Sequence, residues 1–405
     1  MAWHERTKEA MREEFVKKVL EHKDTKTALC REYGISRPTG DKWIQRYLEN
    51  EPLCDQSRKP HITANRISDN MESLIVQYRL KYPVFGAAKL RRIMLNDGVT
   101  SVPCAKTINN VLNRHGLITR EASQAATPYT RFNKSRSNEM WQADYKGHFR
   151  MENAQRCHPL NIIDDYSRFN LCCEAQSTET FQEIQPVMIR LFREYGMPET
   201  FLCDNGNPWG TSQSVGFTAF EVWMMELGIL VLHGRPRHPQ TQGKDESFNR
   251  SFTRECLKLQ TFQNMNDAQQ KFDAYRQLYN NIRPHHALEM AVPSSRYEKS
   301  QREYPKEIIP WEYGDGYTVV KVKDTGYFNF RGQGYFLSEG FRGKKIGIRA
   351  SHIVGQFTLE FRQFKIARLD PEQRVITSRR AYLKEGDPRA VPLTGHSTSG
   401  SGCQG

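Results

Sequence analysis

Hydrophobic positions in the first 50 residues recur at three- and four-residue spacing, the period of an amphipathic helix. Three segments show this pattern: REEFVKKVLEH, KTALCREYG and ISRPTGDKWIQRYLEN. Ser36 precedes the third segment as an expected N-cap, and Pro38 is tolerated in the first turn. The side chains expected to face inward are Phe15, Val16, Val19 and Leu20, then Leu29, Cys30 and Tyr33, then Trp43, Ile44 and Tyr47. The pattern predicts an all-α unit over residues 1–50.

The second and third of these helices are joined by a short turn that contains Gly34. A helix, a glycine-bearing turn and a capped second helix form the helix-turn-helix layout. An ordinary helical hairpin has the same outline, but the basic outer face of the last helix favours DNA binding. The residues expected to reach a major groove are Arg37, Thr39, Lys42 and Arg46.

Residues 51–119 repeat this arrangement in structure, although not letter for letter. After a polar, basic joint come three more helical segments: SDNMESLIVQYRLKYP, GAAKLRRIMLNDG and SVPCAKTINNVLNRHG. The third buries Ile108, Val111 and Leu112 by its periodicity, and we expect Lys106 and Asn109 to contact DNA. The sequence therefore predicts two tandem helix-turn-helix units that could grip a long DNA site.

Strand-like and helical patterns alternate in the middle of the chain. Residues 120–138 are small, polar and basic, as in a linker. From 139 to 300, alternating or short buried runs such as MWQADYKGHF, PLNIIDDYSRF, NLCCEA, TFLCDNG and GILVLH are interleaved with helical segments. An opening three-strand meander followed by alternating helices and strands predicts an α/β domain.

Short strands dominate the last hundred residues. Residues 301–391 contain YTVVKVKD, YFNFRGQGYFL, KKIGIRA, IVGQFTLEFR and FKIARLD, which predict a small antiparallel β-barrel. Residues 392–405 are of low complexity and are expected to be disordered. The fold class is therefore multidomain: tandem all-α units, an α/β core and a small β-barrel.

Composition adds limits to this picture. Mean hydropathy is −0.72, and no run approaches the roughly 18 apolar residues of a membrane span. The N-terminus has no signal-peptide core, and the nine cysteines include no CxxC pair. We expect a reduced protein of the bacterial cytoplasm with no membrane partner.

The net charge of +13 is unevenly distributed. Residues 1–120 carry 22 Lys and Arg against 14 Asp and Glu, and residues 301–405 carry 17 against 11. Residues 121–300 carry 20 against 21. Solvated basic faces are the ordinary explanation, but basic flanks around a neutral centre suggest polyanion-binding arms beside a domain that needs its carboxylates.

Three carboxylates of the central domain fall on polar strand faces or at the ends of elements. Asp144 lies on the first strand, Asp204 ends the run FLC, and Glu246 begins a helix. Each has an ordinary reading: a solvated strand position, an Asp-Asn-Gly turn, and an acid that complements a helix dipole. If the fold brings them together without Cys or His, their oxygens suit Mg²⁺ or Mn²⁺.

These motifs together resemble bacterial insertion-sequence transposases whose catalytic core is of the retroviral-integrase, RNase H type. WQADY, CDNG and PQTQGKDESFN carry the resemblance, and IIDDYSR and YNNIRPHHAL also match. The family pattern assigns its glutamate to Glu246 and the asparagine that follows to Asn249. The resemblance implies that Asp144, Asp204 and Glu246 are catalytic and hold two Mg²⁺ ions, for which Mn²⁺ substitutes.

Two departures from the integrase pattern stand out. No His-His-Cys-Cys spacing occurs near the N-terminus, so we expect no zinc. The interval of 42 residues between Asp204 and Glu246 is longer than is usual in that family, and the extra residues fall in NPWGTSQSVGF. They are consistent with a longer loop beside the site.

Other polar and aromatic residues invite weaker assignments. Asp164 and Asp165 are expected in a structural turn, and Trp141 and Trp209 in core and loop packing. Arg235, Arg237 and Lys244 are expected to hold DNA phosphates beside the site, with Asn249 also close to DNA. Phosphate or structural contacts are expected for His233, His238, His285 and His286. Asp245 is expected only to complement the helix dipole.

The sequence thus predicts a transposase that binds the terminal inverted repeats of an insertion sequence, cleaves at the element ends and joins the 3′-hydroxyls to target DNA. Double-stranded DNA and further copies of the chain, as a dimer or tetramer, are the expected partners, at the nucleoid. The alternatives are a catalytically inactive, transposase-derived DNA-binding regulator and an RNase H-type nuclease without sequence specificity.

Overall fold

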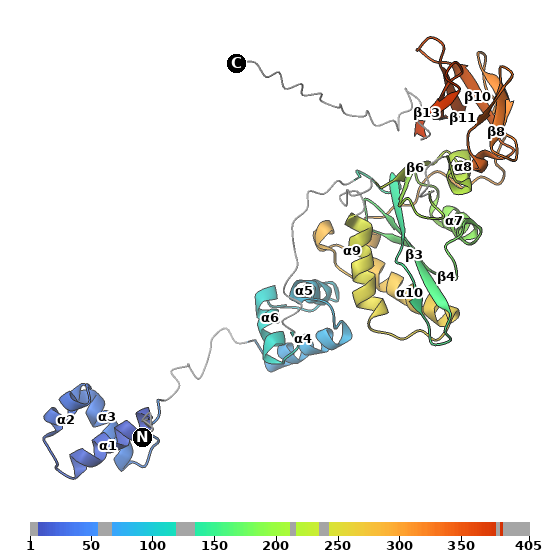
Figure 1. The fold of residues 1–405 in the computed structure, drawn as a ribbon. Coiled ribbons are helices and arrows are strands. Elements are labelled where there is room, and N and C mark those ends of the chain that lie inside the picture. The colour runs from blue at the N-terminus through green and yellow to red at the C-terminus, as the bar shows by residue number, and fades with distance from the viewer. Residues whose placement is uncertain are drawn as a thin grey trace, which may run out of the picture. The chain divides into compact units, whose positions relative to one another are not determined.

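The computed structural model describes residues 7–55, 67–118, 134–210, 216–234, 243–377 and 381–383. The chain divides into two compact units, Met1–Ile67 and Ser68–Gly405. The first is entirely helical in its described part, and the second contains three further helices, a mixed α/β core and a β-rich C-terminal part (Figure 1). None of the described helices is long and apolar enough to cross a membrane.

The first unit is a three-helix bundle of α1 (Lys8–Leu20), α2 (Lys26–Glu32) and α3 (Arg37–Leu48). Each helix begins at a hydroxyl N-cap, and the Ser36 hydroxyl accepts the Thr39 amide as predicted. Most predicted inward residues form the core, with Phe15, Val16, Leu29, Cys30 and Trp43 buried. Leu20 is the exception: it is 42% exposed because it is the last residue of α1 and extends past the bundle.

The next three helices form a second helical group. They are α4 (Asp69–Lys81), α5 (Ala87–Asn96) and α6 (Ala105–Arg114). Ile108, Val111 and Leu112 on α6 are buried, as their spacing predicts. They meet the buried faces of α4 and α5, which supply Ile75, Leu90, Ile93 and Met94.

The α/β core is built on a mixed sheet. Its strands are β1 (Met140–Tyr145), β2 (Phe149–Arg150), β3 (Arg156–Asp164), β4 (Asn170–Gln176), β5 (Thr200–Cys203) and β6 (Leu230–His233). The strand order is β2-β3-β1-β5-β6, and β4 pairs with β3. β1, β3 and β4 form the predicted antiparallel meander, while β5 and β6 continue the sheet in parallel with β1.

Helices cover both faces of this sheet (Figure 1). On one face lie α7 (Phe181–Tyr195) and α8 (Ala219–Glu226); on the other lie α9 (Gly243–Phe252), which continues as a π-helix over Thr253–Leu257, and α10 (Met265–Asn281). Adjacent cysteines on β4 point to opposite faces of the sheet, as neighbouring strand residues do. Cys172 packs in the core shared with α7 and α8, and Cys173 packs in the core shared with α9 and α10. Two short 3₁₀ helices, His286–Leu288 and Pro293–Ser295, follow α10.

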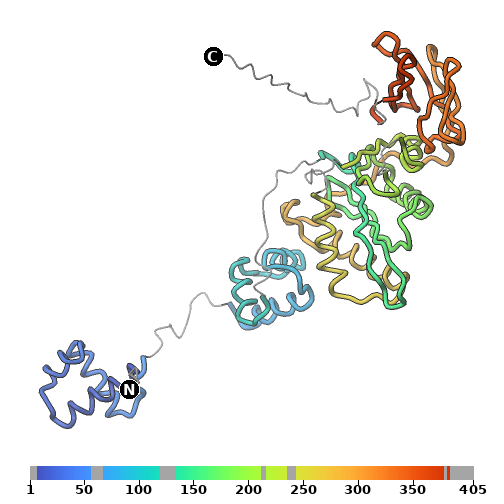
Figure 2. The backbone as a smooth tube through the Cα atoms, in the orientation of Figure 1, coloured from blue at the N-terminus to red at the C-terminus, as the bar shows by residue number. Residues whose placement is uncertain are grey.

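The C-terminal part is antiparallel β structure, drawn in orange to red in Figure 2. Its strands are β7 (Thr318–Lys321), β8 (Tyr327–Phe330), β9 (Gln333–Phe336), β10 (Lys345–Ala350), β11 (Phe357–Phe361), β12 (Phe364–Asp370), β13 (Val375–Thr377) and β14 (Tyr382–Leu383), with a 3₁₀ turn at Glu339–Phe341. One sheet has the order β13-β12-β11-β10-β7, β14 pairs with β12, and β8 and β9 pair separately. No pairing among the described strands closes a barrel, so the barrel stays a prediction.

Candidate active site

Asp144 lies near the end of β1, and Asp204 directly follows the neighbouring parallel strand β5. The register of β1 and β5 pairs Met140 with Thr200 and Gln142 with Leu202. Asp144 stands two residues after Gln142, still on β1, and Asp204 stands two residues after Leu202, just past the end of β5. They are 60 positions apart in the sequence, and the parallel pairing of β1 with β5 brings them back together. Two of the three predicted acids therefore meet at one edge of the sheet.

The surroundings of Asp144 disfavour the ionised form of its carboxyl group. Burial raises the pKa of Asp144 to about 6, and the neighbouring Asp204 carboxylate adds to the rise. Lys146 and a hydrogen bond from Asn249 act in the opposite direction. A cation bound beside Asp144 would favour its ionised form.

Asn249 connects helix α9 to this edge of the sheet. Its side-chain amide donates to Asp144 Oδ2 across 2.6 Å, and its amide oxygen accepts from Asn161 across 2.9 Å. Asn161 stands directly opposite Asp144 in the β1–β3 register. These two hydrogen bonds connect Asn161 on β3 to Asp144 on β1 through Asn249, and they anchor α9 to the sheet.

The two acids at the start of α9 occupy different environments. Asp245 is 5% exposed, and its Oδ2 has no hydrogen-bond partner among the described residues. Burial and then the nearby Asp144 raise the pKa of Asp245 well above its usual value. Glu246 lies on the exposed side of the helix, and Phe248 and Phe252 face the core. A cation arriving from solution can reach Glu246 but not the buried oxygen of Asp245.

Lys244 lies in an internal ion pair. Its Nζ is 2.5 Å from Asp165 Oδ2, and the side chains are 14% and 2% exposed respectively. Burial lowers the pKa of Lys244 to about 8, although Asp165 works in the opposite direction. In this structure the lysine that we expected to hold a DNA phosphate is directed into the protein.

The turn after β3 is structural, as predicted for Asp164 and Asp165. Asp164 accepts from the backbone of Asn138 and from the backbone and hydroxyl of Ser167. Trp141 and Trp209 are fully buried, and Trp209 contacts the rings of Tyr145, Phe201 and Phe220. Both tryptophans therefore have the expected role in packing.

His233 supports the backbone at Asp204. Its Nδ1 is 2.8 Å from the Asp204 carbonyl oxygen, and its Nε2 is 2.9 Å from Glu221 on α8. Burial opposes protonation, but these two acceptors raise the pKa of His233. Because both ring nitrogens face acceptors, the imidazolium fits this place, and the histidine has a structural contact as predicted.

Sequence reasoning missed Gln142, Asn161 and Glu221. Gln142 and Asn161 are amides next to apolar residues in β1 and β3 and are 1% and 3% exposed. A polar residue within a buried strand was the available signal, because a buried amide needs partners. Glu221 had no such signal, since as the third residue of α8 it completes a capping box with Thr218.

The described residues do not gather a third carboxylate with Asp144 and Asp204. Within them, no group of three or more His, Cys, Asp or Glu side chains is arranged to hold a metal ion. The donors present are nevertheless oxygens of carboxylates and amides, with Asp204 beside the largely buried Asp144. That donor set fits a hard divalent cation such as Mg²⁺ or Mn²⁺.

The predicted DNA contacts of the helical units differ in availability. Arg37 and Lys42 on α3 and Lys106 and Asn109 on α6 are exposed, and Thr39 is half-buried. Arg46 is turned inward: its guanidinium donates to the Cys54 carbonyl, and its side chain is 13% exposed. Arg235, Arg237 and His238 lie outside the described residues.

Several known families match the chain. The Integrase core domain matches residues 134–239, and a second family with that description matches residues 227–293. A Helix-turn-helix domain matches residues 11–61, and the IS481 family transposase C-terminal domain matches residues 317–377. The α/β core described above spans the two integrase core matches. Together with the IS481 family match, these domains are those found in integrase-type transposases of insertion elements, and the helix-turn-helix match indicates DNA binding.

Two similar proteins come from bacterial insertion elements. The chain is 26% identical over 180 residues to the uncharacterized 39.2 kDa protein of insertion element IS476 from Xanthomonas euvesicatoria, covering 44% of this chain and 50% of that protein. It is 28% identical over 157 residues to the uncharacterized 31.7 kDa protein of IS407 from Burkholderia multivorans, covering 39% and 54%. The matches thus span about half the length of each relative.

Solved structures give a remote likeness. The simian T-cell lymphotropic virus intasome in complex with PP2A regulatory subunit B56 gamma is 16% identical, with a TM-score of 0.35, covering 71% of this chain and 91% of that one. The HTLV-2 integrase catalytic core domain in complex with magnesium, in its dimeric form, is 14% identical, with a TM-score of 0.28, covering 40% and 95%.

Proposed function

We propose that this protein is a DNA transposase that binds the terminal inverted repeats of its insertion sequence, cleaves at the element ends and joins the 3′-hydroxyls to target DNA. The observation that carries the proposal is that Asp144, near the end of β1, and Asp204, directly after the parallel strand β5, are neighbouring carboxylates in a domain matched by the integrase core family. The C-terminal IS481 family match and the helix-turn-helix match support the same function.

Asp144, Asp204 and Glu246 would hold the divalent cations, with Mg²⁺ as the resident ion and Mn²⁺ as its substitute. Such ions activate an attacking oxygen and stabilise the leaving oxygen of a phosphodiester. The hydrogen bond from Asn249 keeps Asp144 oriented, and the side chain of Asp245 is buried on the inner side of α9. Glu246, on the exposed side of α9, joins the two aspartates when cation and DNA are bound. The attraction between the Glu246 carboxylate and the bound cations would favour this arrangement of the three acids.

The remaining parts of the chain have DNA-binding roles in this proposal. The exposed residues Arg37 and Lys42 on α3, and Lys106 and Asn109 on α6, contact the element ends. Arg235 and Arg237 hold phosphates beside the site. The C-terminal β structure, as a small barrel, completes the grip on DNA. Joining two ends at once requires a dimer or tetramer on DNA. Because the substrate is bacterial DNA, the reaction takes place at the nucleoid.

The experiment is an end-cleavage and joining assay with full-length protein and Mg²⁺. Inverted repeats flanking the gene supply the labelled end DNA, and a random duplex of equal length supplies the control. The proposal predicts cleavage at the element end and joined products for end DNA alone. End binding without cleavage would indicate the inactive regulator, and equal cutting of both duplexes would indicate a nuclease without sequence specificity.

A further inference from the structure

We infer that Lys244 and Asp165 form a clamp that fixes the start of helix α9, so that both act as positioning residues for Glu246. The inference deepens the proposed function and rests on it, because Glu246 is assigned to the site there. It also changes the role of Lys244, which the sequence motif alone placed on a DNA phosphate.

The contact itself is short and enclosed. Lys244 Nζ lies 2.5 Å from Asp165 Oδ2 and 3.4 Å from the Asp165 carbonyl oxygen. The Asp165 side chain is 2% exposed, and that of Lys244 is 14% exposed. A surface ion pair contributes little to structure, but an enclosed pair with this geometry fixes the relative position of the elements that carry it.

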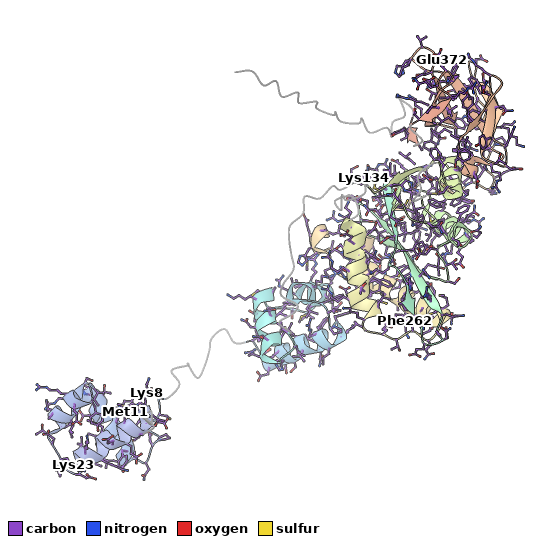
Figure 3. The ribbon with its side chains drawn as sticks, viewed as in Figure 1. Lys8, Met11, Lys23, Lys134, Phe262 and Glu372 are labelled. Atoms are coloured by element: carbon purple, nitrogen blue, oxygen red, sulfur yellow. The ribbon has the colours of Figure 1, made fainter. Side chains whose placement is uncertain are left out.

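The partner of Lys244 is itself held firmly. Asp165 Oδ1 accepts from Gln142 Nε2 across 2.5 Å, and Asp165 Oδ2 also accepts the Lys134 amide across 2.9 Å. Its own amide donates to the Met140 carbonyl oxygen across 2.9 Å. Figure 3 shows Lys134 at one end of the core domain and Phe262 at the other. Asp165 is thus a fixed point at the start of β1, the strand that carries Asp144.

A second tether holds the same helix five residues later. Asn249 donates to Asp144 and accepts from Asn161. At 1.5 Å per residue, Lys244 and Asn249 lie about 7.5 Å apart along the helix axis. Glu246 lies between them. The contacts of Lys244 and Asn249 with the sheet therefore fix the position of α9 along its axis and its rotation about that axis. Both determine where Glu246 lies relative to Asp144.

A role for Lys244 in holding phosphate would require it to leave this place. The Asp165 carboxylate would then lose the Lys244 ammonium while remaining enclosed by the turn and by Gln142. Arg168, which donates to the Asp165 carbonyl, would stay beside it. Removing one member of a buried pair costs more than the pair contributes, because the other charge stays desolvated. One phosphate contact at the protein surface does not offset that loss.

The test compares full-length wild type with Lys244→Met, Asp165→Asn and the double variant. The probes are Mn²⁺ alone, followed by the electron paramagnetic resonance signal of the free ion, and end DNA at a series of salt concentrations. Arg250→Met is the matched control, because Arg250 is an exposed cation on the same helix. Lys244→Arg tests rescue, and thermal unfolding confirms that each variant is folded.

The clamp predicts that Lys244→Met and Asp165→Asn each weaken Mn²⁺ binding by about 10-fold or more, the range for residues that support metal ligands. The double variant should be no weaker than the weaker single, Lys244→Arg should recover most of the affinity, and Arg250→Met should bind Mn²⁺ as wild type does. The salt dependence of DNA binding should be unchanged in Lys244→Met.

Two results would overturn the clamp. One is a salt slope that falls by about 0.9 in Lys244→Met with Mn²⁺ binding intact, which is the behaviour of a phosphate contact. The other is a lower melting temperature in the clamp variants with unchanged Mn²⁺ affinity, which is a purely structural role. Failure of the proposed function would be seen separately, as equal Mn²⁺ binding by wild type and Asp144→Asn.

Discussion

Asn249 donates its side-chain amide to Asp144 Oδ2 across 2.6 Å, and this bond joins a helix to a strand 105 residues earlier in the chain. The same side chain accepts from Asn161, so its orientation is fixed from both sides. The amide therefore fixes the position of Asp144, a predicted catalytic acid whose pKa is raised by burial and by the neighbouring Asp204.

Replacing Asn249 should impair chemistry while sparing DNA binding. We expect Asn249→Leu to slow cleavage of element ends by about 10–100-fold, the usual loss when a supporting partner of a metal ligand is removed. Ser247→Ala, on the exposed side of the same helix, is the control and should be active. Cleavage rates for the two purified variants decide the matter; an Asn249→Leu variant as fast as wild type would show that Asp144 needs no such support.

Replacing Lys42 or Arg46 on α3 with alanine should have different effects, on DNA binding for Lys42 and on stability for Arg46. Lys42 is exposed, so Lys42→Ala should keep the fold and reduce the salt slope of end binding by about 0.9 if it contacts a phosphate. Arg46 lies 5.2 Å from the Trp43 ring centre and donates to the Cys54 carbonyl. Arg46→Ala should instead lower stability by on the order of 1 kcal/mol. Salt-dependent binding and thermal unfolding separate the two; equal loss of slope in both would contradict the assignment.

Much of the fold could be predicted from local pattern. Periodicity gave the helices of the first two helical groups, and alternation gave the meander, because each depends on which face of an element is buried. Leu20 was placed wrongly because periodicity continues to the last residue of a helix, whereas the contact surface of the bundle ends earlier. The closure of the C-terminal strands depends on long-range pairing that no local pattern encodes.

The candidate site was predictable in its parts but not in its contacts. The motif singled out Asp144, Asp204 and Asn249, and the fold brings these three together at one edge of the sheet. The internal direction of Lys244 could not be predicted, because it depends on Asp165, a partner 79 residues earlier in the chain. The opposite burial of Asp245 and Glu246 follows from helix geometry, since adjacent residues point about 100° apart.

Acid should destabilise the fold through His285. Burial, and then Arg283 and Lys89, lower the pKa of His285 to about 2 in the folded chain, while an unfolded histidine titrates near about 6.5. Below that pH the unfolded state takes up a proton that the folded state refuses, so stability falls as pH falls. The loss is at most about 1.4 kcal/mol per pH unit.

The measurement is urea unfolding at pH 7 and pH 5 for wild type and His285→Gln. We expect the free energy of unfolding to fall more steeply in wild type, because the variant has no imidazole at this position to protonate. Identical pH dependence in the two proteins would show that another group governs acid sensitivity.

Metal removal should abolish both steps of the reaction. Because Asp144 and Asp204 are neighbouring carboxylates in the proposed metal site, we expect no productive arrangement of DNA without a divalent cation. Cleavage and joining should disappear in EDTA, return with Mg²⁺ or Mn²⁺, and survive a zinc-selective chelator. Strand transfer by protein freed of metal with EDTA, with no metal added back, would contradict the two-ion proposal.

The most direct test of the central claim compares Glu246→Gln with Asp245→Asn in cleavage and joining of labelled element ends. We expect Glu246→Gln to lose both steps by well over about 10²-fold and to keep end binding, since even removing a supporting partner of a metal site costs about 10–100-fold. Asp245→Asn should keep most activity, because the buried Asp245 has a raised pKa and a neutral amide of the same shape replaces it. An active Glu246→Gln beside an inactive Asp245→Asn would contradict the account.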